Sequence, residues 1–281
     1  EDNTMGLPIL ILGYSGSGKS ASMRNFGADE IALVNVNGKA LPFRTQFRQV
    51  LCSDQYPEID RFLRSVTAKV IVIDDCQYLM ANEFMRRAKE KSYDKFTEIG
   101  QSFWTLVHSV FTLPQDVTVY FLSHIDTDEN GRQKAKTIGK LLDEKITVEG
   151  MFTTVLKTVV QDGQYLFATQ TDGRDTCKSP MGLFPSMYID NDLKAVDSAI
   201  REYYSLMPEV ICADCGKAVR AVKNKTAADI AAGTQKTYGK KLCWECACKA
   251  MKQRKEQTNA NAQTVPDGTG AAGQSVVAGR A

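Results

Sequence analysis

The strongest constraint on the fold is an apolar segment that runs directly into a glycine-rich loop. Residues 8 to 20 read Pro-Ile-Leu-Ile-Leu-Gly-Tyr-Ser-Gly-Ser-Gly-Lys-Ser. The apolar part predicts a buried strand, and residues 21 to 26 are expected to form a helix. Between them lies Gly13-x-x-x-x-Gly18-Lys19-Ser20, a phosphate-binding loop pattern in the strand–loop–helix context that it requires. A chance glycine- and serine-rich turn is a poor explanation, so a nucleoside triphosphate site is predicted.

Each part of this loop has an expected role. Gly13, Gly16 and Gly18 allow positive φ and close backbone approach, so that successive N–H groups can face a phosphate at a helix N-terminus. Lys19 is expected to reach the β- and γ-phosphates, and the Ser20 hydroxyl to coordinate Mg²⁺. The predicted cofactors are therefore ATP and Mg²⁺. The predicted binding residues are Gly13, Tyr14, Ser15, Gly16, Ser17, Gly18, Lys19 and Ser20.

A second apolar run supplies acidic residues for the same site. Residues 70 to 73 are all apolar, and Asp74 and Asp75 follow them directly. In parallel α/β sheets, ligands bind at the carboxyl ends of the strands. Asp74 is expected to contact the magnesium ion through water, and Asp75 to orient or deprotonate the attacking water. Capping of a helix that begins at Gln77 remains an open alternative for Asp75.

The rest of the first two hundred residues predicts strands that alternate with helices. Strands are expected at 31–36 and 116–122, and helices at 57–66, 77–110 with a break near Ser92, 137–144 and 192–206. Residues 126–136 are expected to form a mobile loop. Strands at 153–160 and 164–169 flank Asp162-Gly163, a hairpin signal. Together these segments predict an α/β fold with a mostly parallel sheet, helices on both faces and a late antiparallel hairpin.

Composition divides the 281 residues into unequal parts. No apolar run approaches the length of a membrane span, and the acidic N-terminus is unlike a signal peptide, so a cytoplasmic protein without membrane contact is expected. We predict three regions: an α/β core over 1–207, a basic metal-binding module over 208–256 and a disordered tail over 257–281.

Paired cysteines predict the metal site of this module. Cys212 and Cys215 form one Cys-x-x-Cys pair, and Cys243 and Cys246 form another. Four thiolates complete a tetrahedral structural site for Zn²⁺. Cys248 is a fifth candidate, which could replace Cys246, and the alternative is a set of surface thiols.

The same module is strongly basic. Residues 216 to 256 contain eleven Lys and Arg against three Asp and Glu. Tyr238 and Trp244 could stack on bases, so single-stranded nucleic acid is the expected partner. A solvated basic face on a zinc ribbon, or a surface for protein contacts, remains open.

The core resembles the phage-encoded RecA-like ATPases of the Sak type and the related phage AAA-annotated ATP-binding proteins. The resemblance rests on residues 12–20, 72–75, 120–124, 136–140, 149–152 and 178–180. It implies a RecA-like P-loop fold and a phage-encoded ATPase of the host cytoplasm. It further implies action on single-stranded DNA in annealing or strand pairing, as a homo-oligomer and beside a single-strand-binding protein.

The resemblance also suggests roles for residues outside the loop. His124 is expected to sense the γ-phosphate. Arg132, Lys134, Lys136 and, less strongly, Lys178 could reach a neighbouring subunit's nucleotide or a DNA backbone, or could simply be solvated.

One departure concerns the catalytic glutamate that RecA-like cores often carry after their second strand. Residues 34 to 38 read Val-Asn-Val-Asn-Gly at that place. Either Asp75 takes over that role or turnover is slow.

Three functions are therefore compared. The first is an ATPase that acts on single-stranded DNA in recombination or replication. The second is a nucleotide-dependent scaffold or loader that binds replication or recombination proteins through its zinc module. The third is a small-molecule kinase, which the zinc module and the lack of a lid-like arginine cluster disfavour.

Overall fold

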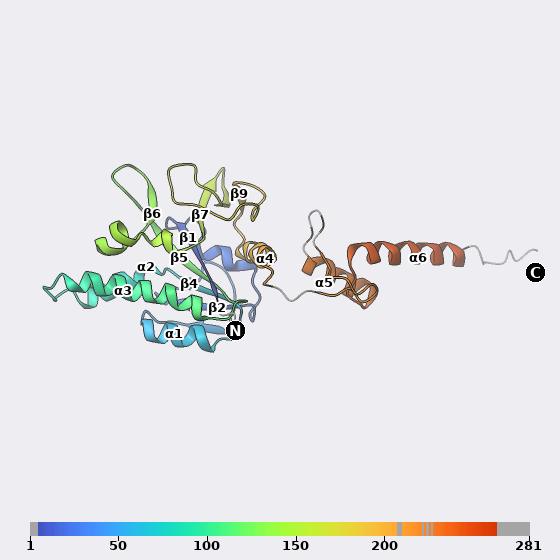
Figure 1. Ribbon diagram of the computed structural model, residues 1–281, viewed down its shortest axis with the longest axis horizontal. Coiled ribbons are helices and arrows are strands. Elements are labelled where there is room, and N and C mark those ends of the chain that lie inside the picture. Colours follow the sequence, from blue (N-terminus) through green and yellow to red (C-terminus); the bar gives the residue numbers. More distant parts are fainter. Residues whose placement is uncertain (1–4, 207–209, 221, 223–224, 226, 263–281) are drawn as a thin grey trace, which may run out of the picture. The chain divides into compact units, whose positions relative to one another are not determined.

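The chain forms two units that are described separately. The computed structural model describes residues 5–206, 210–220, 222, 225 and 227–262. Clustering of the backbone divides the chain into Glu1–Met207 and Pro208–Ala281. Figure 1 gives the element labels used below.

The first unit is built on a nine-stranded sheet, which is parallel from β3 to β7 and antiparallel at its β8–β9 end. The strands follow the order β3-β2-β4-β5-β1-β7-β8-β9, and β6 pairs with β5 alone. This confirms the predicted mostly parallel sheet and its late hairpin. The strands are β1 (Leu7–Gly13), β2 (Ile31–Asn35), β3 (Gln49–Leu51), β4 (Val70–Asp74), β5 (Thr118–Thr127), β6 (Gln133–Ala135), β7 (Thr154–Gln161), β8 (Gln164–Ala168) and β9 (Tyr188–Asp190).

Helices cover both faces of this sheet because the central strands are apolar on both sides. In β1, Leu10 and Leu12 pack with the cluster that holds α1, α2 and α3 (Figure 1). Ile9 and Ile11 alternate with them and pack on the opposite face with the 3₁₀ turn η1 and with α4. The helical elements of this unit are η1 (Ser20–Asn25), α1 (Tyr56–Ser65), α2 (Gln77–Arg86), α3 (Asp94–Ser109), η2 (Val110–Thr112), η3 (Leu141–Ile146), η4 (Val148–Met151) and α4 (Leu193–Tyr203).

The predicted hairpin turn is present at Asp162 and Gly163, whose φ angles are 51° and 76°. Both lie in the left-handed region, as a tight two-residue hairpin requires. A second hairpin was missed. The expected mobile loop over 126–136 contains the end of β5 and the strand β6, which pair antiparallel. Residues 133 to 135 are Gln-Lys-Ala, so their strand conformation comes from this pairing and not from an apolar pattern.

Other local predictions need correction. The helix expected over 137–144 begins only at Leu141, as the π-helix η3, and a 3₁₀ turn follows it. The helix expected over 21–26 is the 3₁₀ turn η1. The short strands β3 and β9 lie at the ends of the sheet and were not predicted.

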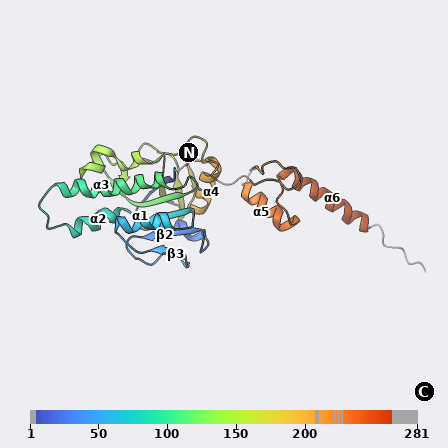
Figure 2. The ribbon, with the colours of Figure 1, turned by 60° about the horizontal axis from the view of Figure 1, so that its bottom comes forward.

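The second unit is helical and small. Its helices are α5 (Ala227–Tyr238) and α6 (Trp244–Ala262). Its buried core consists of Cys212, Val219, Ile230, Leu242 and Ala247. Figure 2 shows α5 and α6 in a second view.

The predicted disordered tail is corrected over 257–262, because α6 continues to Ala262. Residues 263–281 lie outside the described part of the chain. Within the described part, no helix is both long enough and apolar enough to cross a membrane.

Candidate functional site

The ends of three adjacent parallel strands bring the predicted site residues together. β5 lies between β1 and β4, and all three strands run in the same direction. Gly13, at the end of β1, is in register with His124 of β5. Asp74 ends β4, so the glycine-rich loop, the acids and the histidine share one edge of the sheet.

Two features of the loop 13–20 require glycine. Gly18 has a φ of 98°, which side chains rarely adopt. A Cβ atom on Gly13 would lie 2.0 Å from Thr158 Oγ1 and 2.7 Å from Ser17 Oγ. The loop therefore packs tightly against β7, and this packing fixes its backbone.

Lys19 lies inside this loop. Its Nζ donates to the carbonyl oxygens of Gly13 and Tyr14, each at 2.9 Å. Burial lowers the pKa of Lys19, against the opposing effect of the nearby Asp75 and Asp74 carboxylates. A largely desolvated cation among backbone groups is well suited to hold an anion, because few waters compete with it.

Ser20 and Asp74 form the pair that the sequence predicted as magnesium ligands. Ser20 Oγ donates to Asp74 Oδ1 at 3.0 Å. Burial raises the pKa of Asp74 to about 6, although the Ser20 hydrogen bond acts in the opposite direction. A hydroxyl and a carboxylate oxygen side by side are hard ligands of the kind that Mg²⁺ prefers, so these two residues fit the ion.

Asp75 has a strained backbone, with a φ of 59°. Its carboxylate accepts hydrogen bonds from Asn37 Nδ2 at 3.2 Å and Lys39 Nζ at 3.3 Å, and lies 3.2 Å from His124 Nε2. The alternative of capping does not occur, because α2 begins after Cys76 and has no side-chain cap.

The protonation of Asp75 differs from that of its neighbour. Burial alone would raise the pKa of Asp75, but the hydrogen bonds of His124 and Asn37 and the charge of Lys39 lower it to about 2. Asp75 is therefore a firmly ionised anchor with little affinity for a proton.

His124 is held from two sides. Its ring contacts Asp75, and its backbone N–H donates to Gln77 Oε1 at 3.2 Å. The ring also packs edge-on against Tyr78, with 6.0 Å between the centroids. A cavity of about 230 Å³ opens beside it and is also lined by Lys136.

The other predicted cations lie elsewhere. Arg132, Lys134 and Lys178 line a second cavity, of about 520 Å³. Lys134 forms an ion pair with Asp143. Burial lowers the pKa of Lys178, which the Glu149 carboxylate opposes. The structure thus groups three of the four predicted cations and places Lys136 near His124 instead.

A hydrogen-bonded chain that the sequence did not reveal connects the loop with the larger cavity. Tyr14 Oη lies 3.2 Å from Thr127 Oγ1 and accepts from Gln133 Nε2 at 3.1 Å. Gln133 Oε1 accepts from Lys157 at 3.0 Å, and Lys157 is paired with the buried Asp175, which lines that cavity. These residues are spread over the chain, so no local pattern could have joined them.

Further contributors to the site were also missed. Thr158 Oγ1 lies 2.5 Å from Ser17 Oγ, and Asn37 and Lys39 contact Asp75. Asn37 lies in the segment 34–38, which the sequence resemblance placed where RecA-like cores carry a glutamate, but its contact with Asp75 was not predicted. Thr158 carries no sequence signal, because its partner lies on a distant strand–loop junction.

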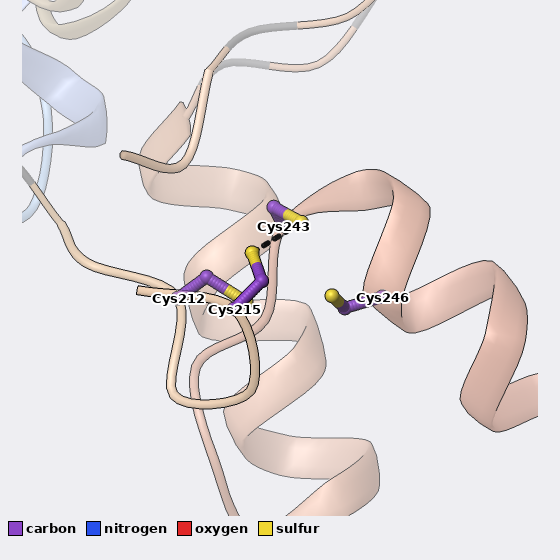
Figure 3. Close-up of side chains that lie close together, drawn as sticks. All are labelled: Cys212, Cys215, Cys243 and Cys246. Atoms are coloured by element: carbon purple, nitrogen blue, oxygen red, sulfur yellow. Dashed lines mark hydrogen bonds between the residues drawn. The ribbon is translucent and has the colours of Figure 1, made fainter. Parts of the chain in front are cut away.

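The second unit contains the predicted cysteine cluster. The sulfur atoms of Cys212, Cys215, Cys243 and Cys246 all lie within 4.8 Å of one another. Figure 3 shows the first two on a turn and Cys246 on α6, with a dashed line for the 3.7 Å contact between Cys215 and Cys243. Cys248 is not part of this group. The four thiols could bind a metal ion such as zinc.

Comparison with known proteins gives no family assignment. No protein-family model matches this chain, and no curated protein matches it either.

Proposed function

We propose that the first unit binds ATP with Mg²⁺ at the edge of its sheet and hydrolyses it, as the resemblance to phage RecA-like P-loop ATPases suggests. The observation that carries the proposal is the 3.0 Å contact between Ser20 and Asp74, beside a loop that encloses the Lys19 ammonium. The serine at the start of η1 and the aspartate at the end of β4 meet where the sequence pattern needs a shared metal.

The parts of the site have separate tasks in this proposal. The N–H groups of residues 13–20 bind the phosphates, and Lys19 contacts the β- and γ-phosphate oxygens. Ser20 and Asp74 hold Mg²⁺, which when bound neutralises charge on the transferred phosphoryl group. The RecA-like assignment is supported by the order of the strands, which places the acid-bearing β4 next but one to β1.

Asp75 and His124 act as a positioning pair. A carboxylate with a pKa of about 2 is a weak general base, because proton transfer is efficient only when the pKa lies near the working pH. We infer that Asp75 orients His124 toward the γ-phosphate instead of deprotonating water. With asparagine at 35 and 37, hydrolysis is expected to be slow.

Single-stranded DNA is the proposed partner in recombination or replication. The second unit has nine exposed Lys and Arg side chains among its described residues: Lys217, Arg220, Lys225, Lys236, Lys240, Lys241, Lys249, Lys252 and Arg254. Such a surface attracts the phosphate backbone without reading sequence. A homo-oligomer and a single-strand-binding partner follow from the resemblance.

The test is ATP hydrolysis by the full chain with and without single-stranded DNA. We expect slow Mg²⁺-dependent turnover that DNA accelerates, and loss of turnover in Lys19→Ala. Lys69→Ala is a suitable control, because Lys69 pairs with Asp116 and precedes β4, at the opposite end of that strand from Asp74. Failure of ATP to bind in the presence of Mg²⁺ would refute the proposal.

A nucleotide-dependent scaffold or loader is the second candidate function. The low proton affinity of Asp75 favours it, because a protein that binds ATP but turns it over slowly acts as a switch. In that case, ATP binding would change the capture of a replication protein by the second unit. DNA-stimulated hydrolysis would decide for the first function, and its absence with intact ATP binding would decide for the second.

A further inference from the structure

A groove between α5 and α6 lies outside the cysteine cluster. Its volume is about 270 Å³, which is slightly below the range of pockets for drug-sized ligands. The groove fits one planar group better than a whole molecule. Its lining residues are Lys225, Asp229, Ile230, Gly233, Thr234, Thr237, Tyr238, Trp244, Ala247, Cys248 and Met251.

The two walls follow from helical spacing. Residues 230, 233, 234 and 237 form one stripe of α5, and residues 244, 247, 248 and 251 form the facing stripe of α6. Gly233 widens the space between them, because a Cβ atom built there meets nothing within 4 Å. The groove is therefore open where a side chain would otherwise fill it.

Trp244 is the main aromatic surface of the groove. It is 44% exposed, although a tryptophan usually has most of its surface buried. Lys225 Nζ lies 5.8 Å from the centre of its ring. Tyr238 stands on the opposite wall, so an inserted planar group would have an aromatic ring and a cation beside it.

The groove lining carries one cation, Lys225, and one carboxylate, Asp229, so the excess positive charge that would attract a polyanion lies on the helix surfaces around it. Lys225 is in its wall, and Lys236 of α5 and Lys249 and Lys252 of α6 are exposed on the helices that form it. Nucleic acid strands combine flat bases with a charged backbone, and proteins bind them through basic grooves with stacking aromatics. An acidic peptide could use the lysines but would leave the Trp244 surface without a matching flat group.

The cysteine cluster lies next to the tryptophan in the chain. Trp244 lies between the metal-ligand candidates Cys243 and Cys246, in the first turn of α6. A metal held by these thiols would fix the start of α6 against the turn that carries Cys212 and Cys215. The α6 wall of the groove therefore depends on the same ion.

We propose that this groove binds a single unstacked base of a nucleic acid strand, which stacks on Trp244 while the surrounding lysines hold the adjacent phosphates. The proposal rests on the proposed function in one respect, the choice of single-stranded nucleic acid as partner. It adds a base-binding site in the second unit that is separate from the ATP site.

The test uses the fluorescence of Trp244 in the full chain. The sequence has two tryptophans, so Trp104→Phe leaves Trp244 as the only one. A short oligothymidylate should quench the zinc-loaded protein, whereas an abasic oligonucleotide of the same length should bind more weakly and quench little. Equal binding and quenching by both oligonucleotides would overturn the proposal, because the contact would then involve phosphates alone.

Variants distinguish the contribution of base stacking to oligonucleotide binding from the contribution of the lysine charges. Binding of oligothymidylate should weaken about tenfold in Trp244→Ala, and Trp244→Phe should restore part of it. Gly233→Leu should block the groove without harming α5, because leucine is the better helix former. Lys236→Ala is the matched control, since it lies outside the groove and should weaken both oligonucleotides alike. Unchanged affinity in Trp244→Ala and Gly233→Leu would also overturn the proposal.

Three further measurements identify the cause of any failure. Chelation of the metal should abolish the quenching, and its persistence would overturn the link between metal and groove. Quenching by an acidic aromatic peptide but not by oligothymidylate would assign the groove to a protein partner. Lys19→Ala should leave the quenching intact. If the unaltered protein fails to bind ATP but still shows the quenching, only the proposed ATPase function is refuted.

Discussion

The two units stabilise their functional sites in different ways. In the first unit, the loop 13–20 directly follows a strand of a sheet that has apolar residues on both faces. Buried contacts such as the one between Ser17 and Thr158 hold this loop in place. Among the described residues of the second unit, the cluster of buried apolar side chains has five members, one of which is the metal-ligand candidate Cys212. A core of this size leaves little hydrophobic stabilisation, so small domains of this kind commonly need a metal. The packed fold of the first unit thus holds its site in place, whereas metal binding at the second site is expected to fold the second unit.

If the four cysteines bind zinc as proposed, the largest effect should follow removal of that ion. Chelation or Cys243→Ser should unfold the second unit, because the binding energy of a structural zinc ion, roughly 10–16 kcal/mol in finger peptides, is folding energy. The first unit should melt as before. Hydrogen exchange resolved by segment measures both units at once. Cys248→Ser is the control, since Cys248 lies outside the cluster. Protection of α5 and α6 without metal would contradict this comparison.

The second-largest loss of stability is expected from a glycine substitution in the first unit. Gly13→Ala places a Cβ atom 2.0 Å from Thr158 Oγ1, so it should destabilise the first unit by about 3 kcal/mol. Denaturant unfolding measures the change. Adding Thr158→Ala should recover part of the loss, because the closest contact disappears. An additive double variant would show that the loop is not held by this contact.

The adjacent carboxylates should affect stability in opposite directions. Burial raises the pKa of Asp74 to about 6, so its ionised form destabilises the folded unit at neutral pH. Asp74→Asn should therefore raise the free energy of unfolding without ligand by about 2 kcal/mol, while it weakens Mg²⁺-ATP binding. Thermal melts with and without Mg²⁺-ATP separate the two effects. A less stable variant in the absence of ligand would contradict the desolvation argument.

The stability that Asp75 contributes should depend on pH in the opposite sense from that of Asp74. Its folded pKa of about 2 lies below the unfolded value, so its stabilisation is present above about pH 4 and is lost as the pH falls toward 2. Asp75→Asn should remove about 2 kcal/mol at neutral pH and flatten this acid limb. Asp74 acts in reverse, because its folded form gains stability as the pH falls through about 6. Urea unfolding from pH 7 to pH 3 measures both slopes.

The smallest effect is expected in the second unit. Gly233 lies in α5 with open space around its missing Cβ. Gly233→Ala should therefore stabilise this unit by about 0.5–1 kcal/mol, the opposite sign from Gly13→Ala. The midpoint of zinc-dependent folding, followed by circular dichroism, measures it. A destabilised Gly233→Ala protein would mean that α5 packs more tightly than the structure shows.

Features whose signals are contiguous in the chain were predictable from the sequence. The β1 strand and the loop 13–20 are predicted from one short stretch of sequence. The spacing of the two Cys-x-x-Cys pairs is enough to predict a metal site. Alternating apolar runs were also sufficient for the parallel sheet, for the break between α2 and α3 and for the β7–β8 hairpin, because each of these depends on local periodicity and turn residues.

Elements without a local signal were missed. β6, β3 and β9 are short strands that exist because a neighbouring strand offers unpaired backbone groups. The helical character of the second unit was hidden in the same way, because the expectation of a zinc ribbon came from the cysteine spacing and not from the residues between the pairs.

The contacts between the chemical groups became visible only in the folded chain. It brought Ser20 to Asp74 and tied Asp75 to His124 and Asn37, which turned a possible base into an anchor. Burial and distance set these properties, and both depend on residues that are far apart in the chain. A sequence pattern can specify which group is present, but its pKa and its partners arise only when distant strands pack together.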